Sequence, residues 1–240
     1  GSPFGLQYEA QNDTAYFKKS ISDGSSLESS GTRIYNRLAA SYAWRNQWGY
    51  VKPELSVRNV NTFYDRDTVT SQSLTADDGS NQRSAVVPQF TVDATAVFER
   101  EGRFLQSITP RFFYAYAPYR NQTNYPNFDT TTASLNYDQL FNPYRFYGHD
   151  RLDDNNFASL GATYRAFDNV GLERLRVSLG QSYYFSDRKV RLMPQDAIAT
   201  SNNSGPAIAI GSQLSRKFSI NANSLWLANG KNSENDVQLN

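Results

Sequence analysis

The chain has 240 residues, a formal net charge of +1 and no cysteine. The near-neutral charge argues against nucleic acid as a partner, and without thiols neither disulfides nor thiolate chemistry is possible. Tyrosine (16) and phenylalanine (15) are abundant, although the mean hydropathy is −0.64. Disordered chains are poor in aromatic residues, whereas a transmembrane β-barrel joins an apolar outer face to a polar interior.

Apolar residues recur mainly at every second position, and helical patterns are weak along the chain. A period of two is typical of β-strands. The longest uninterrupted apolar run, residues 112–118, is far shorter than the ~18 residues that a membrane-spanning helix needs. The sequence therefore predicts an all-β fold of antiparallel transmembrane strands.

We expect about nine or ten strands, each close to the length that a tilted strand needs to cross a bilayer. In chain order, nine segments show the pattern: residues 6–18, 32–45, 50–63, 86–101, 107–118, 157–167, 175–185, 207–215 and 218–226. A soluble β-sandwich also consists of strands and turns, but its strands usually have about 5–6 residues. The strand length therefore favours part of a larger outer-membrane barrel.

The alternation is clearest in residues 86–101, where the even positions are apolar from Val86 to Phe98. Successive side chains of a strand point to opposite faces, so the polar odd positions share the other face. We predict that these side chains face the lumen of a barrel. They are Gln89, Thr91, Asp93, Thr95 and Glu99.

The connections between the predicted strands alternate between short and long. Short links lie at residues 46–47, 101–103, 168–171 and 216–217, and long loops lie near 20–31, 65–84, 119–155 and 187–205. Tight periplasmic turns and extended outer loops are typical of outer-membrane barrels. We therefore treat residues 1–240 as a single β-barrel segment.

The long segment 119–155 is too aromatic for disorder, and loops of more than about 15 residues are usually functional or disordered. One reading folds it over or into the lumen, where it packs against a plug protein or neighbouring loops. The other reading is a self-packed surface loop. The candidate residues are Tyr125, Phe128, Tyr137, Phe141, Tyr144, Tyr147, Asp150 and Arg151.

Catalytic chemistry is difficult to build from this sequence. His149 is the single histidine, and no GxSxG elbow accompanies it. Asp150, Asp153 and Asp154 lack the spacing of an EF-hand, so we interpret them as a solvated acidic turn paired with Arg151. Neither phosphate-binding nor zinc motifs occur. We therefore predict a protein that is no enzyme and needs no cofactor or metal.

Four segments together resemble one family, the LPS-assembly outer-membrane protein family LptD. They read VVPQFTVDATAVFERE (86–101), SITPRFFYAYAPYRNQTNYPNFDT (107–130), LFNPYRFYGHDRLDDNN (140–156) and GLERLRVSLGQSYYFSDR (171–188). The resemblance is strongest over residues 86–188; outside them we recognise only the general strand pattern.

The resemblance implies a large barrel in the bacterial outer membrane that translocates lipopolysaccharide (LPS) and assembles it at the cell surface. In this family the barrel encloses the plug lipoprotein LptE and receives LPS from a periplasmic jelly-roll domain joined to bridge proteins. The glycan passes through the lumen while the lipid leaves between the first and last strands. The implied partners are LptE, LPS, outer-membrane lipids and periplasmic bridge proteins, with no nucleic acid.

The chain departs from the family pattern because it lacks the jelly-roll domain and the family's cysteines, and it stops at Asn240 without a terminal aromatic strand. We therefore expect an internal portion of the barrel wall that does not transport LPS alone. Two other readings stay open: a general porin or outer-membrane hydrolase barrel, and a soluble β-rich carbohydrate-binding module.

Overall fold

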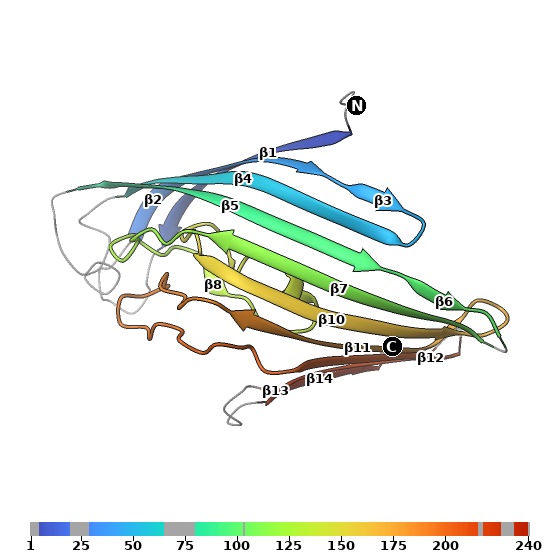
Figure 1. The fold of residues 1–240 in the computed structure, drawn as a ribbon. Coiled ribbons are helices and arrows are strands. Elements are labelled where there is room, and N and C mark those ends of the chain that lie inside the picture. The colour runs from blue at the N-terminus through green and yellow to red at the C-terminus, as the bar shows by residue number, and fades with distance from the viewer. Residues whose placement is uncertain are drawn as a thin grey trace.

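The computed structural model describes residues 5–19, 29–64, 80–102, 104–215, 218–226 and 233–239. Ten long strands follow one another in a single antiparallel sheet (Figure 1). They are β1 (Leu6–Lys19), β2 (Ser29–Tyr42), β4 (Gly49–Tyr64), β5 (Gln82–Ala96), β7 (Leu105–Ala117), β10 (Asn155–Phe167), β11 (Glu173–Tyr184), β12 (Ala207–Ser215), β13 (Phe218–Trp226) and β14 (Ser233–Leu239). The predicted all-β antiparallel fold is confirmed.

Two of these strands continue in short pieces after a break. Strand β3 (Trp44–Asn46) follows β2 and pairs with β4, and β6 (Phe98–Arg100) follows β5 and pairs with β7. Between β7 and β10 lie β8 (Thr131–Thr132), the 3₁₀ helix η1 (Asp138–Phe141) and β9 (Phe146–Tyr147). Across the described ranges, no helix is long and apolar enough to cross a membrane.

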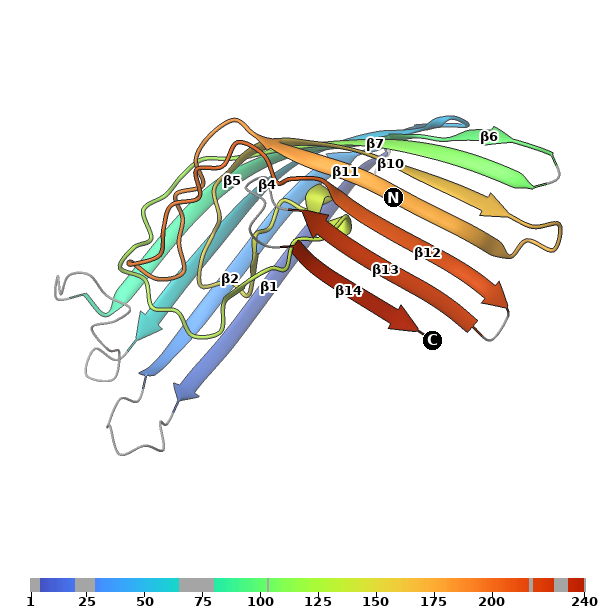
Figure 2. The same cartoon turned by 90° about the horizontal axis from the view of Figure 1, so that it is seen from below.

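The sheet is open at both sides in the part of the chain that the structure describes: β1 pairs only with β2, and β14 only with β13. Figure 2 shows the sheet curved into a trough. The open, curved sheet agrees with the expectation of part of a larger barrel. Strand β14 was not among the nine predicted segments, because its sequence, SENDVQL, has only two apolar residues.

The two faces of the sheet have opposite character. On the convex face large apolar side chains are exposed, and Leu38 and Leu55 are each 64% accessible. On the concave face polar side chains are buried, with Arg58 at 2% and Gln89 at 3%. Globular proteins in water show the reverse distribution, and exposed apolar areas of this kind mark membrane or partner contacts.

Strand register keeps each face continuous across the sheet. Ala40 of β2 lies opposite Leu55 of β4, which lies opposite Phe90 of β5, so an apolar row crosses the convex side. One residue away, Ser56 lies opposite Gln89 on the concave side. A one-residue slip would move every one of these side chains to the other face.

Short turns join the strands at one end of the trough. In the turn between β10 and β11, Oδ1 of Asp168 accepts hydrogen bonds from the amides of Val170 and Leu172, at 3.0 and 2.9 Å. Gly171 follows in the left-handed region with φ 78°, which glycine adopts without steric cost. The short link predicted at residues 168–171 therefore has a local cause.

The long connections lie at the other end of the trough. Two strands extend into segments that the sequence analysis assigned to long loops. Strand β2 begins at Ser29 and β5 at Gln82, so residues 29–31 and 82–84 belong to ladders rather than to the loops 20–31 and 65–84. Pairing with the neighbouring strand supplies their backbone hydrogen bonds. Residues 20–28 and 65–79 of these predicted loops lie outside the described residues.

The register between β4 and β5 can be tested with paired cysteines, because the chain contains none. Asn61 lies opposite Ser84, and opposite residues of an antiparallel pair have Cβ atoms within about 4.5–5.5 Å. Cysteines at 61 and 84 are expected to form a disulfide on oxidation, measured by mass spectrometry. Cysteines at 61 and 85 point to opposite faces and should stay reduced; a bridge there would disprove the register.

Candidate functional site

The candidate site is the segment between β7 and β10, residues 118–154, which we call the inner loop. Figure 2 shows that it lies within the curve of the trough. Its Tyr137, Leu140 and Phe141 pack against Phe113 of β7 and Phe157 of β10 in one apolar cluster. The inner loop therefore packs on the strands and is no self-packed surface loop.

A second apolar cluster joins the inner loop to the other half of the trough. Tyr125 and Leu152 of the loop pack with Tyr35, Val60 and Val87, which come from β2, β4 and β5. Together, the two clusters attach the inner loop across five neighbouring strands of the sheet.

Two glycines make room for η1 against the sheet. A Cβ atom at Gly161 would lie 2.6 Å from Cζ of Phe141, and one at Gly180 would lie 3.0 Å from Cδ1 of Leu140. These two glycines lie opposite each other on β10 and β11. The lack of side chains at both positions is what allows the 3₁₀ helix to approach the backbone of the sheet.

Hydroxyl groups flank this glycine pair on both sides. Ser159 donates to the carbonyl of Leu140 and contacts Ser182 at 2.6 Å. On the other side, Thr163 lies 2.9 Å from Ser178, and the phenol of Tyr137 lies 3.2 Å from Thr163. These hydrogen bonds satisfy polar groups that the inner loop covers, as buried polar groups require.

The acidic segment 150–154 anchors the inner loop to the strands. Asp150 is 1% exposed and lies 2.8 Å from Nη1 of Arg33 on β2. Asp153 lies 2.6 Å from Nη1 of Arg58 on β4. Asp154 lies 2.9 Å from Nη2 of Arg145 within the loop. Expecting a solvated acidic turn was wrong, because arginines 95 and 117 positions away in sequence reach these carboxylates.

The other oxygen of Asp150 organises the loop itself. Oδ2 accepts hydrogen bonds from the backbone amides of Phe128, Asp129 and Thr130, at 2.9, 3.0 and 3.2 Å. The hydroxyl of Thr130 also lies 3.0 Å from this oxygen. One carboxylate thus ties three consecutive amides to a strand arginine.

Arg151 has a different role from the expected pairing with the neighbouring acids. Its guanidinium donates to the carbonyls of Tyr125 and Pro126 in the inner loop and of Arg191 and Leu192 in the next long connection. Burial lowers the pKa of Arg151 to about 10, so the side chain stays charged at neutral pH. It cross-links two long loops through their backbones.

His149 lies at the boundary between the inner loop and the edge strand β1. Its ring stacks on Tyr35 with centroids 3.8 Å apart, and its Nε2 is 3.8 Å from Oδ2 of Asp13 on β1. Burial and the charge of Arg33 lower the pKa of His149, against opposing effects of nearby carboxylates. We therefore assign the neutral form at pH 7.

The predicted strand residues occupy the concave face. Gln89 and Thr91 are buried there, and Asp93 forms a two-point ion pair with Arg111 at 3.0 and 2.9 Å. Thr95 donates to the carbonyl of Pro110. Glu99 is exposed on β6, opposite Ser107. Their exposure to a lumen stays a prediction.

Most of the predicted loop residues come together. Tyr125, Tyr137, Phe141, Asp150 and Arg151 are buried, and Phe128 stacks on Phe17 of β1 with centroids 4.8 Å apart. Tyr144 lies under the guanidinium of Arg58 at 5.2 Å. Tyr147 differs, because it is 58% exposed and belongs to neither apolar cluster.

The sequence did not single out Arg33 and Arg58 as site residues. For Arg33 the sequence contained a partial signal, since Arg33 and Arg37 occupy the polar positions of the alternating segment 32–45. An arginine at a polar position of a strand is equally compatible with a buried side chain and with a solvent-exposed one. Only the folded loop identifies the acidic partner.

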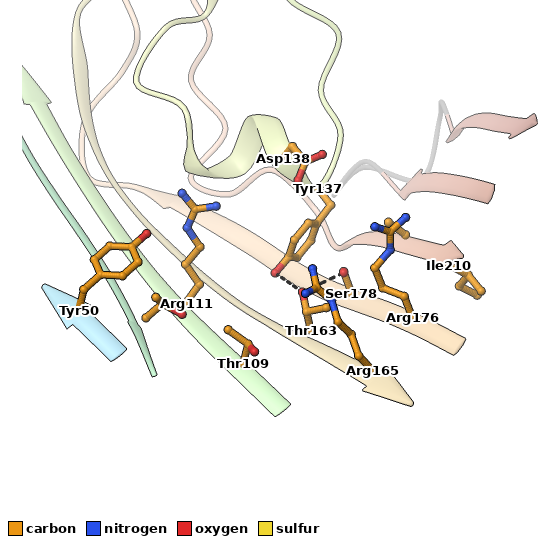
Figure 3. A pocket seen from close by; sticks show the side chains of 12 residues that line it. Tyr50, Thr109, Arg111, Tyr137, Asp138, Thr163, Arg165, Arg176, Ser178 and Ile210 are labelled. Atoms are coloured by element: carbon orange, nitrogen blue, oxygen red, sulfur yellow. Dashed lines mark hydrogen bonds between the residues drawn. The ribbon is translucent and has the colours of Figure 1, made fainter. Parts of the chain in front are cut away.

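A cavity of about 560 Å³ lies on the concave face, between η1 and the short-turn end of the strands. Figure 3 shows Arg111, Arg165 and Arg176 on its strand wall, with Tyr137 and Asp138 at the inner loop. Arg165 and Arg176 are cross-strand neighbours that share Glu173, at 3.5 and 3.7 Å. The wall is therefore polar and charged, suited to water or to a hydrophilic solute.

A second cavity of about 380 Å³ lies between the inner loop and strands β1, β2 and β4. Glu9, Arg37 and Arg58 line its strand side, and Tyr144 and His149 line its loop side. Arg37 is paired with Glu9 and Glu54. Both cavities combine charged and aromatic side chains without a nucleophile–base pair.

A curved antiparallel sheet with an apolar convex face and a polar concave face is typical of a segment of a β-barrel wall. The sequence model of the LptD family, described as LPS transport system D, matches residues 1–240. The chain belongs to the LptD family. The family match covers the whole chain, beyond the residues 86–188 on which the resemblance rested.

Relatives agree with this assignment. The LPS-assembly protein LptD of Acinetobacter baumannii is 63% identical over 239 residues, covering 100% of this chain and 29% of the relative. That of Acinetobacter baylyi is 59% identical over 241 residues, covering 99% and 29%. That of Pseudomonas savastanoi pv. phaseolicola is 34% identical over 215 residues, covering 80% and 23%. The chain spans less than a third of the length of these relatives.

Replacing Asp150 by asparagine should detach the inner loop, because it removes the charge that pairs with Arg33 and leaves one acceptor oxygen where the carboxylate uses two, one for Arg33 and one for three amides. Removing one partner of a buried pair costs about 3 kcal/mol, or about a hundredfold in an equilibrium constant. Hydrogen exchange at the amides of Phe128, Asp129 and Thr130 should accelerate about a hundredfold. The exposed Asp187→Asn variant is the control; equal protection in both variants would refute the anchor.

Acidification should loosen the inner loop through His149. Its pKa in the folded state lies below the ordinary value of about 6.5, so the unfolded loop binds more protons and stability falls as pH drops through about 6.5. Protection factors of the amides in residues 118–154, from hydrogen exchange corrected for the pH dependence of the intrinsic rate, should therefore be lower at pH 5.5 than at pH 7.5. His149→Phe keeps a ring against Tyr35 and should abolish the difference; an unchanged pH response would exclude His149 as its source.

Proposed function

We propose that this chain forms part of the wall of an outer-membrane β-barrel that translocates LPS and assembles it at the cell surface. The observation that carries the proposal is the reversed polarity of the sheet in a member of the LptD family. Exposed leucines on the convex face suit lipid, and buried arginines on the concave face suit a hydrated interior. Residues 1–240 then act as one barrel segment in a longer protein.

In this proposal the concave face lines the lumen, and the inner loop narrows it. Gln89, Thr91, Asp93 and Thr95 share that face with the polar cavity of Figure 3. A wall of guanidinium, carboxylate and hydroxyl groups can exchange hydrogen bonds with a passing glycan, whereas an apolar wall could not. The exposed Tyr147 offers a contact for a plug lipoprotein such as LptE.

The proposed role is transport without catalysis. The relatives carry the name of an assembly protein. Within the inner loop, the ring of His149 stacks on a tyrosine and faces carboxylates and an arginine, an arrangement that holds the ring and does not activate a nucleophile. LPS, outer-membrane lipids and periplasmic bridge proteins are the partners expected of the whole protein.

An arginine introduced on the convex or on the concave face of the sheet distinguishes a membrane-embedded barrel wall from a water-soluble protein. Leu160 on the convex face of β10 is 55% exposed, so Leu160→Arg would be harmless in water. In a bilayer it should cost about 2–4 kcal/mol and reduce insertion of the full-length protein into the outer membrane. Thr109→Arg, which faces the concave cavity, is the matched control and should insert normally.

The same cells test the cargo, with surface LPS and exclusion of large antibiotics as readouts. Surface LPS should fall with the amount of inserted Leu160→Arg protein and stay normal in Thr109→Arg. Loss of insertion with unchanged surface LPS would contradict the transport role. Normal insertion of Leu160→Arg would contradict the membrane placement.

A further inference from the structure

An apolar groove of about 520 Å³ crosses the convex face of the sheet. One of its walls is a row of residues in register on five neighbouring strands: Tyr8, Ala40, Leu55, Phe90 and Tyr116. Its volume lies in the range of small-ligand sites, which is about 300–1,000 Å³. The groove is therefore large enough for a flexible apolar chain.

The opposite wall is the next row of the same face. Leu38, Val57 and Pro88 lie in register on β2, β4 and β5. Ala40 is the smallest side chain of the first row and lies between Tyr8 and Leu55. A small residue between large neighbours creates the depression.

The groove crosses the strands and reaches the long-loop end of the trough at β7. At β1 it starts at Tyr8, opposite Ala40 of β2. At β7 it ends at Tyr116 and Pro118, where the inner loop begins at the long-loop end. In outer-membrane barrels the long loops are extracellular, so this end belongs to the cell-surface side under the proposed function.

Two basic side chains lie next to Tyr119, the residue that follows Pro118 at the long-loop end of the groove. Arg120, two residues after Pro118, is exposed and donates to the carbonyl of Val86 at 3.3 Å and to that of Tyr119 at 3.4 Å. Nζ of Lys189 lies 5.9 Å from the ring centroid of Tyr119. A guanidinium has five donors, so Arg120 retains N–H groups for an anion after these two contacts.

We propose that this groove binds one acyl chain of an LPS molecule in the surface leaflet, with a phosphate of the same molecule at Arg120 and Lys189. The inference rests on the proposed function for the orientation of the wall. Close packing against the two walls of the groove favours the chain through dispersion contacts, and the two cations attract a phosphate. LPS carries both groups, phosphate on sugar and acyl chains, and fits the surface end of the groove.

The dimensions agree with a single chain. Four strand-to-strand steps of about 4.8 Å give a length of about 19 Å. One leaflet of hydrocarbon is about 15 Å thick, half of the usual core. Because barrel strands are tilted by about 35–45°, a groove perpendicular to them is inclined in the leaflet and covers most of its depth.

Filling the groove tests the site. The full-length protein, extracted from outer membranes in mild detergent, is titrated with purified LPS, and bound molecules are counted by native mass spectrometry. Ala40→Phe should weaken binding of one LPS molecule at least tenfold, and Arg120→Gln about threefold. Ala162→Phe adds the same ring to the convex face of β10, outside the groove, and should bind LPS as the wild type does.

Three outcomes would overturn the site. The first is unchanged LPS binding by Ala40→Phe, and the second is an equal loss of LPS binding in Ala162→Phe. The third is that Ala40→Phe weakens the binding of phosphatidylglycerol, titrated in parallel, as much as it weakens the binding of LPS. Surface LPS is measured separately in cells that produce Ala40→Phe. Normal delivery with weakened binding supports the groove and leaves the transport role intact. Absence of LPS delivery by the wild-type protein would refute the proposed function, whereas unchanged binding by Ala40→Phe refutes only the groove.

Discussion

The placement of the inner loop on the sheet depends on two buried arginine–aspartate contacts, Arg33 with Asp150 and Arg58 with Asp153. Transferring these four charges from water is expensive, and a buried pair contributes little net stability compared with apolar residues of the same size. Losing one partner is far more costly. The contacts therefore act mainly on position: each carboxylate has a strongly preferred place along a particular strand.

From these two points the arrangement of the inner loop follows. Asp150 and Asp153 are three residues apart, and their partners lie on the neighbouring long strands β2 and β4. With the acidic segment held there, η1 meets the gap above Gly161 and Gly180 on the far side of the trough. Arg151, between the two acids, then reaches the carbonyls of the next long connection. The inner loop is therefore held in place by three kinds of contact: ion pairs with strand arginines, packing against two glycines, and hydrogen bonds from Arg151 to backbone carbonyls.

Much of the fold was predictable because strand alternation is a local property. Nine strand segments, the polarity of residues 86–101 and the short links could be read from neighbouring residues alone. Strand β14 escaped because its sequence lacks clear alternation. Its place in the ladder depends on the backbone of β13. The aromatic content of the inner loop also indicated packing, and Tyr137 and Phe141 do pack on the sheet.

The sequence alone determined the all-β class, the two-faced strands and the alternation of short and long connections, since each follows from the order of residues within about fifteen positions. Its blocks from Val86 to Arg188 also pointed to the right family. Tertiary structure decided that Asp150, Asp153 and Asp154 are anchors and not a solvated turn. The strand partners of Asp150 and Asp153 are about a hundred residues away in sequence, and only the curved sheet brings those charges within ion-pair distance.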